Sequence, residues 1–134
     1  MFAGGLRTYF VEAILHDLKI GKSYSLLKVR NLPLSITNTG EGSVRLKIEA
    51  LRPEPDETLS GFEPIPDPSW ISFERDIFTV EPKGTGQTDI TISVPDDERY
   101  LGKRYQVVIF SRTTSGMIGA GFRSRLLFSI DSVR

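Results

Sequence analysis

Few residues in this chain have the types and spacing that catalysis or metal binding requires. His16 is the only histidine and cysteine is absent, so thiolate chemistry, disulfides and cysteine metal sites are excluded. A serine–histidine–aspartate triad would lack its Gly-x-Ser-x-Gly turn, which does not occur here. We therefore interpret His16, near the end of an expected strand, as a surface residue. We expect no enzyme activity, no catalytic residues, no metal site and no cofactor.

Two loops carry charged residues in arrangements that resemble ligand sites. Asp96, Asp97 and Glu98 follow Pro95, and several carboxylates in one loop can coordinate calcium. They lack the spacing and the glycine of a known calcium loop, which favours a solvated turn that ends a strand. The run Lys83-Gly84-Thr85-Gly86 is similar to a phosphate-binding loop, but such a loop leads into a helix and here a strand follows.

The overall charge argues against nucleic acid and membranes as partners. Basic and acidic residues balance at 17 each, so no global field attracts a polyanion. No apolar run approaches the roughly 20 residues of a membrane helix, and residues 1–5 lack the charged start and apolar block of a signal peptide. The abrupt entry into a strand favours an exported module whose leader has been removed. We expect an extracytoplasmic location (periplasmic, surface or secreted), with a cytoplasmic one left open.

Alternating apolar and polar residues predict strands along almost the whole chain. The first is expected at 8–15, and a hairpin joins 32–37 to 44–50 around Asn38-Thr39-Gly40. Further strands are expected at 70–73, 77–81, 88–94, 104–112 and 122–130. About eight antiparallel strands predict an all-β fold, an immunoglobulin-like β-sandwich, with 1–134 as one domain and its core between about 8 and 131.

The segment 52–69 differs from the rest because it contains five prolines, which cannot donate ladder hydrogen bonds. We expect an extended connection that crosses from one sheet to the other. Its length exceeds that of most connections, which raises the prospect of a functional loop around Phe62 and Ile65. Trp70, directly after it, is expected in the core between the sheets. Gly102 followed by Tyr105 predicts a tyrosine corner, whose hydroxyl bonds to the backbone.

The order of these features resembles a known group of proteins. The Asn38-Thr39-Gly40 turn, Trp70, the run 78–82, the run 88–95 and the Gly-Lys-x-Tyr-x-Val run at 102–107 follow one another as in bacterial immunoglobulin-like modules. Such modules accompany glycosidases and peptidoglycan-associated surface proteins, and they are similar in logic to major-sperm-protein and pilus-chaperone sandwiches. The resemblance covers about 32–130 and implies a non-catalytic accessory or interaction domain. It carries over no binding residue, because the paired basic residues of the pilus-chaperone cleft cannot be placed here.

The outward sides of the last two strands are the most distinctive surface. If Tyr105, Val107 and Ile109 point inward, their neighbours point outward, and Phe10 and Ile14 of the first strand join them. Arginine and aromatic residues are enriched at protein interfaces, whereas scattered exposed apolar residues are also normal. We predict a partner-binding surface formed by Arg104, Val108, Phe110, Arg123, Arg125 and Leu127.

These observations predict a non-catalytic structural or protein-interaction module of a bacterial envelope or secreted protein. Its partner would be another protein or an adjoining domain, with no nucleic acid bound and no insertion into a membrane. The alternative is a carbohydrate-associated module that binds a glycan, with Trp70 as a sugar-stacking residue. The partner, the oligomeric state and any glycan specificity stay open.

Overall fold

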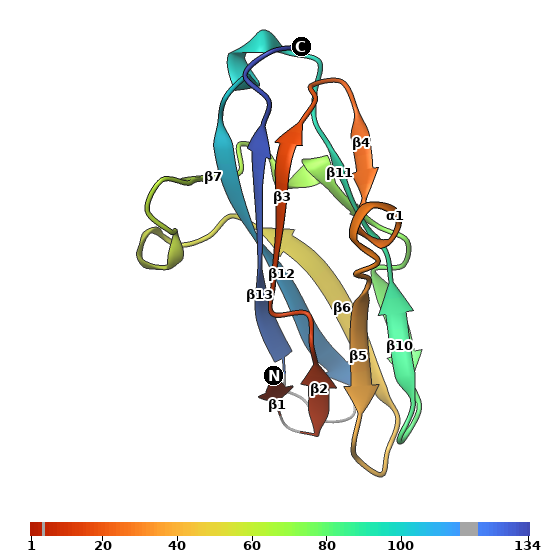
Figure 1. The fold of residues 1–134 in the computed structure, drawn as a ribbon. Helices are drawn as coiled ribbons and strands as arrows, with labels where there is room; N and C mark the ends of the chain where they lie inside the picture. Colours follow the sequence, from red (N-terminus) through yellow and green to blue (C-terminus); the bar gives the residue numbers. More distant parts are fainter. Residues whose placement is uncertain (4, 116–120) are drawn as a thin grey trace.

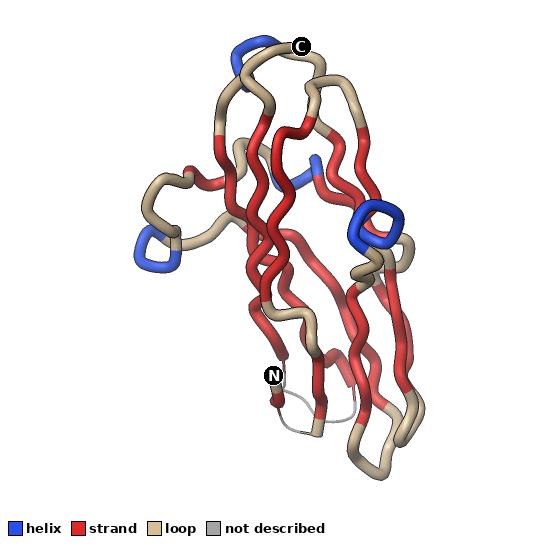
Figure 2. Tube along the Cα trace, viewed as in Figure 1, coloured by secondary structure: helices blue, strands red, loops and turns tan. Residues whose placement is uncertain are grey.

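Strands make up most of the chain in the computed structural model, which describes residues 1–3, 5–115 and 121–134 (Figure 1). Helical turns are short and lie between strands (Figure 2). The strands are β1 (Phe2–Ala3), β2 (Leu6–Thr8), β3 (Glu12–Leu18), β4 (Ser23–Ser25), β5 (Leu34–Asn38), β6 (Val44–Leu51), β7 (Glu63–Pro64), β8 (Ile71–Phe73), β9 (Ile77–Val80), β10 (Thr85–Thr88), β11 (Ile90–Ser93), β12 (Arg104–Ser115) and β13 (Gly121–Ile130). The helical pieces are α1 (Leu26–Arg30), η1 (Pro55–Glu57), η2 (Pro68–Trp70) and η3 (Glu98–Tyr100).

The strands form two layers of an immunoglobulin-like β-sandwich. The large sheet has the order β3-β13-β12-β6-β9, with β7 attached to β12. The smaller sheets are β1-β2-β5-β10 and β4-β11-β8. Only Asp89 separates β10 from β11, so the two smaller sheets follow each other and form the second layer (Figure 1). Most ladders are antiparallel, as expected, but β3 pairs with β13 in parallel. The predicted hairpin between 32–37 and 44–50 is wrong, because β5 pairs with β2 and β10 in one layer and β6 pairs with β12 and β9 in the other.

An aromatic cluster occupies one end of the core and confirms two of the expectations. Trp70 is buried, with ring centroids 4.8 Å from Tyr100, 5.6 Å from Tyr105 and 6.5 Å from Phe128. The first two contacts are edge-on, the geometry that aromatic rings prefer. Trp70 and Tyr105 are therefore core residues.

The predicted tyrosine corner, in which the Tyr105 hydroxyl bonds to the backbone, is wrong. Among the described residues the Tyr105 hydroxyl has no hydrogen-bond partner, and burial together with the charge of Glu63 raises the pKa of Tyr105 to about 12. A different tyrosine bonds to the backbone, since the Lys19 N–H donates to Tyr24 Oη at 2.7 Å. The Tyr105 ring belongs to the aromatic cluster, and the link between adjacent chain segments is made by Tyr24.

The first expected strand divides between the two layers. β2 pairs with β5 in a smaller sheet, and β3 pairs with β13 in the large one. The chain crosses at Phe10, where the Phe10 N–H donates to Thr8 Oγ1 and Ser124 Oγ donates to the Phe10 carbonyl. Phe10 is buried at this crossing, so its predicted outward position is wrong. The strand alternation is interrupted there, and the ring turns into the core.

A bulge near the end of β3 changes which side chains face inward. The register with β13 shifts between Phe128 and Ile130, and Asp17 adopts a left-handed backbone with φ of 58°. The Asp17 N–H donates to Ser129 Oγ at 2.9 Å. Leu15 and Leu18 are consequently both buried although they are three residues apart.

The proline-rich segment 52–69 leads from β6 of the large sheet to β8 of a smaller one. It returns to the large sheet on the way, because β7 pairs in parallel with β12 and the Ile65 N–H donates to the Gln106 carbonyl at 2.9 Å. Ile65 is fully buried in the core, so its side chain does not reach the surface of the predicted functional loop. Phe62 is half-buried and lies 4.7 Å from the Arg104 guanidinium carbon.

A substitution at Gly86 tests how closely β10 packs against the core. A Cβ added at Gly86 would lie 2.6 Å from Cε2 of the buried Phe78 ring, whereas one added at Gly42 would meet nothing within 4 Å. We expect Gly86→Ala to lower the free energy of unfolding by about 1–3 kcal/mol, and Gly42→Ala to change it by less than about 0.5 kcal/mol. Urea unfolding measures both. Equal stability of the two variants would contradict the close packing.

Candidate functional site

The predicted partner surface is a grid of cross-strand neighbours on the outer face of the large sheet. Val108 of β12 lies opposite Arg125 of β13, and Phe110 lies opposite Arg123. The row of Arg125 continues to Glu12 on β3. The structure thus brings most of the predicted residues together, as the alternation of the two strands implied.

Intramolecular partners engage the arginines of this face. Arg123 pairs with Glu57 at 2.6 Å and lies over the Phe110 ring, while Arg125 pairs with Glu12 at 2.9 Å. Arg104 stacks on Phe62. These contacts lower the charge and the donor capacity that the face offers to another molecule.

Two of the predicted surface residues are buried. Val108 is 3% exposed and Leu127 is 1% exposed, so their predicted exposure is wrong. The neighbouring Gln106 binds the segment that covers this face. Its Oε1 accepts from the Leu59 N–H and its Nε2 donates to the Glu57 carbonyl, both at 2.8 Å. The proline-rich segment is therefore held against this face, and the sequence contained no signal for that contact.

A small polar cavity marks the junction between the segment and the sheet. Its volume is about 150 Å³, and its lining residues include Glu57, Gln106, Val108, Arg123 and Arg125. The Arg123 hydrogen bond holds the pKa of Glu57 below its usual value. The arrangement binds one part of the chain to another, and its charges are already matched.

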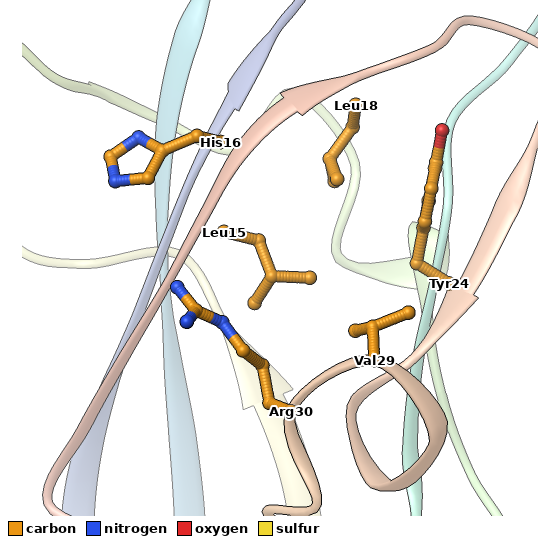
Figure 3. Close-up of a pocket in the computed structure, with 6 residues that line it drawn as sticks. All are labelled: Leu15, His16, Leu18, Tyr24, Val29 and Arg30. Carbon is orange, nitrogen blue, oxygen red and sulfur yellow. The ribbon is translucent and has the colours of Figure 1, made fainter.

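A larger and more apolar groove lies along β3, at the edge of the large sheet. A cavity of about 360 Å³ separates β3 from α1 and β4 (Figure 3). Leu15 and Leu18 point into it from β3, with Tyr24 and Val29 on the opposite side. His16 also lines the cavity, and its ring lies on the side of β3 opposite to the side chains of Leu15 and Leu18 (Figure 3). Sequence reasoning missed this site.

A second cavity extends the groove along the same strand. It measures about 290 Å³ and is lined by Glu12, Ala13, Ile14, Arg30 and Leu32. Arg30 lines both cavities, so it stands between them. The two together run beside the whole length of β3.

β3 ends the large sheet, and within the described residues β13 is its only ladder partner. Peptide groups of a strand point alternately to its two sides. The Val11 carbonyl accepts from Arg125 N on the β13 side, whereas the Ile14 carbonyl accepts from Arg30 Nη2 on the groove side. The groove is therefore bordered by the open hydrogen-bonding edge of a strand.

The short helix α1 forms the opposite wall of the groove and holds Val29 and Arg30. Ser25 caps its start by accepting from the Lys28 N–H at 3.2 Å, and Asp89, between β10 and β11, accepts from the Leu27 N–H at 3.0 Å. Asn31 ends the helix with a left-handed φ of 51°. The serine cap and the asparagine five residues after Leu26 were the available signals, but five residues are too few to show helical periodicity.

The other charged motifs have structural partners. Asp96 and Glu98 both bind Arg134, and Asp97 caps η3 by accepting from the Arg99 N–H. Lys83 donates to the Thr39 carbonyl at 2.7 Å, which ties two turns together. Across the described residues there is no cluster of three or more histidine, cysteine or acidic side chains suited to a metal ion. In the same part of the chain, no helix has the length and apolarity needed to span a membrane.

Comparison with known proteins relates this chain to others by fold alone. No family model and no curated protein matches its sequence. Among solved structures it is similar to the ASH/PapD-like domain 7 of human CEP192, with a TM-score of 0.63 and 13% identity over 98% of this chain and 89% of that one. A candidate carbohydrate-binding protein from Bacteroides ovatus matches with a TM-score of 0.64 and 11% identity over 96% of this chain. The periplasmic chaperone SfaE matches with a TM-score of 0.61 and 13% identity over 94% of this chain.

The chain spans 37% of the Bacteroides protein and 57% of SfaE. These likenesses confirm the immunoglobulin-like fold and its expected similarity to pilus-chaperone sandwiches. At such low identity they assign no function.

The Glu57–Arg123 pair tests how the proline-rich segment is attached. Because Arg123 lowers the Glu57 pKa in the folded state, the pair stabilises the fold above the unfolded pKa, and this contribution is lost as the pH falls through the folded pKa. We expect Arg123→Gln to lower the free energy of unfolding by up to about 1 kcal/mol near neutral pH. The difference from wild type should shrink in acid. Urea unfolding across the pH range measures it.

Lys28→Gln is the control, because Lys28 is exposed and has no ion pair in the described chain. If the loss of unfolding free energy in Arg123→Gln stays constant with pH, the stabilisation by Arg123 does not come from its pair with Glu57.

Proposed function

We propose that this chain is a non-catalytic protein-interaction module that accepts an extended segment of a partner protein along the free edge of β3. The observation that carries the proposal is the apolar groove beside an unpaired strand edge. Extended peptides commonly bind in this way, by adding a strand to an exposed sheet edge while side-chain pockets supply specificity.

The dimensions of the edge suit a short segment. β3 contains seven residues, and at about 3.3 Å per residue it offers roughly 20 Å of edge. Every second side chain of an added strand would face the groove, where Val29 is exposed and Tyr24 half-buried, and the buried Leu15 and Leu18 form the floor. The last turn of α1 adds positive charge through Lys28 and Arg30. The expected occupant is therefore an extended, alternately apolar segment without basic residues on its groove side.

The setting of the module is part of the same proposal. The likeness to a periplasmic chaperone supports a protein partner and an extracytoplasmic location, as part of a bacterial envelope or secreted protein. On the outer face of β12 and β13, Arg104 and Phe110 keep some exposure and offer a contact to an adjoining domain.

A glycan is the second candidate ligand, at a different place from the one expected. Trp70 is buried and cannot stack on a sugar. Phe2 and Tyr9 are 74% and 81% exposed, and they flank Arg7, which lies opposite Phe2 and 5.6 Å from the Tyr9 ring. An exposed aromatic ring offers an apolar face to a sugar ring, and an arginine beside it can bind the carboxylate of an acidic sugar. We propose the outer face of β1 and β2 as this alternative site.

The strand-addition proposal can be tested with a model peptide, acetylated Thr-Val-Thr-Val-Thr-Val-Thr. We expect NMR shift changes and slowed amide exchange at β3 and α1, because new backbone hydrogen bonds form at that edge. Val29→Glu should weaken binding about tenfold by placing a charge in the apolar groove. The matched control is Ile77→Glu, since Ile77 is 45% and Val29 49% exposed. Shift changes away from β3, or equal effects of the two variants, would refute the proposed site.

The glycan alternative makes a separate prediction. Trigalacturonate should shift the amide signals of β1 and β2, and Tyr9→Ala should weaken its binding about tenfold by removing the stacking ring. Ile77→Ala serves as the control for loss of an exposed apolar side chain. The alternative fails if trigalacturonate and a neutral glucose trisaccharide both leave these signals unchanged.

A further inference from the structure

We infer that the segment bound along β3 carries an acidic side chain at its centre, and that Arg30 is the residue that recognises it. The inference rests on the proposed strand addition and names the chemistry of the segment. Arg30 stands between the two cavities of the groove, so a side chain at the middle of the segment meets it.

Arg30, on α1, differs from three arginines on the outer face of the large sheet. Arg112, Arg123 and Arg125 each pair with a glutamate within 3 Å. In the described part of the chain Arg30 pairs with no carboxylate, and its one hydrogen bond goes to the Ile14 carbonyl. A guanidinium has five N–H donors in a planar fork. Most of the donor capacity of Arg30 is therefore unused.

The charges around the groove favour an acidic ligand. Glu12 lines the second cavity, but its carboxylate is engaged by Arg125 at 2.9 Å. Lys28 adds a further cation on α1, and Lys19 beyond the end of β3 is neutralised by Asp131 at 2.7 Å. Asp17 and Asp89 have no ion pair among the described residues, but neither of them lines the two cavities. An incoming carboxylate thus meets Arg30, which lines both cavities, and this local charge favours a complementary charge in a partner.

Strand addition and the present bond of Arg30 compete for the same atom. An added strand would use the Ile14 carbonyl as an acceptor for its own N–H. Arg30 now covers that carbonyl, as charged side chains often protect a sheet edge from unwanted pairing. A carboxylate can offer Arg30 a bidentate pair in exchange for its single bond to the carbonyl. A neutral segment offers no such exchange and has to displace Arg30 at a cost.

The positions of the cavities define a pattern for the segment. Side chains two residues apart on a strand point to the same face. A central acidic residue opposite Arg30 therefore places its neighbours at minus two and plus two in the cavities of about 290 Å³ and 360 Å³. The pattern is apolar-x-acidic-x-apolar, with unspecified residues at x.

The test uses the full 134-residue chain and two acetylated heptapeptides, Thr-Val-Thr-Asp-Thr-Val-Thr and its variant with a central asparagine. Wild type should bind the aspartate peptide about threefold to fivefold more tightly than the asparagine peptide, with the preference falling as salt is added. Arg30→Gln should reduce the preference to about one, and it should bind the asparagine peptide at least as well as wild type does. Lys28→Gln is the control and should keep most of the preference.

The outcomes separate this inference from the proposed function. If both peptides bind at β3 with equal affinity, the acidic preference is wrong while strand addition stands. If neither peptide perturbs β3, strand addition itself is wrong. Should Arg30→Gln fold poorly, Arg30→Lys replaces it. That variant keeps the charge but loses the planar fork, and an unchanged preference in it would overturn recognition by a bidentate pair.

Discussion

The parallel pairing of β3 with β13 is the interaction on which the rest of this structure depends. It moves the chain from one layer to the other at Phe10, and it places Leu15 and Leu18 in the core. It also makes β3 the last strand of the large sheet, so one of its edges has no ladder partner in the described chain. A further strand paired with that edge would have filled the groove. The fold and the candidate site thus have the same origin.

The outer face of β12 and β13 shows how a surface rich in arginine can serve the interior of a protein. The Gln106 side chain satisfies two backbone groups of the proline-rich segment, and Arg123 holds Glu57 of the same segment. Buried polar groups are tolerated when they are hydrogen-bonded in this way. The segment, whose prolines exclude regular ladder bonds, is thereby fixed by side chains. Its position explains why Val108 and Leu127 are buried on what would otherwise be an exposed face.

The contrast between the two sides of the large sheet favours the β3 groove as the functional surface. Arg123 and Arg125 of the outer face are paired with glutamates, whereas the groove combines apolar side chains with an arginine that has no carboxylate partner among the described residues. Binding energy comes mainly from apolar burial, and charges contribute specificity. The immunoglobulin-like sandwich occurs in proteins as different as a human CEP192 domain and a bacterial periplasmic chaperone. A shared scaffold of this kind leaves function to local features such as this edge.

The sequence by itself determined most of the longer strands, the inward set that includes Val107 and Ile109, the core role of Trp70 and the scarcity of catalytic residue types. These follow from composition and from a period of two, which are local properties of the chain. Only the tertiary structure decided what covers each face. Gln106 and Glu57 are 49 residues apart, and Leu15 and Val29 face each other from different layers. Alternation predicts which side of a strand a residue occupies. Whether that residue is exposed, and whether a groove forms beside the strand, depends on segments distant in the sequence that pack there.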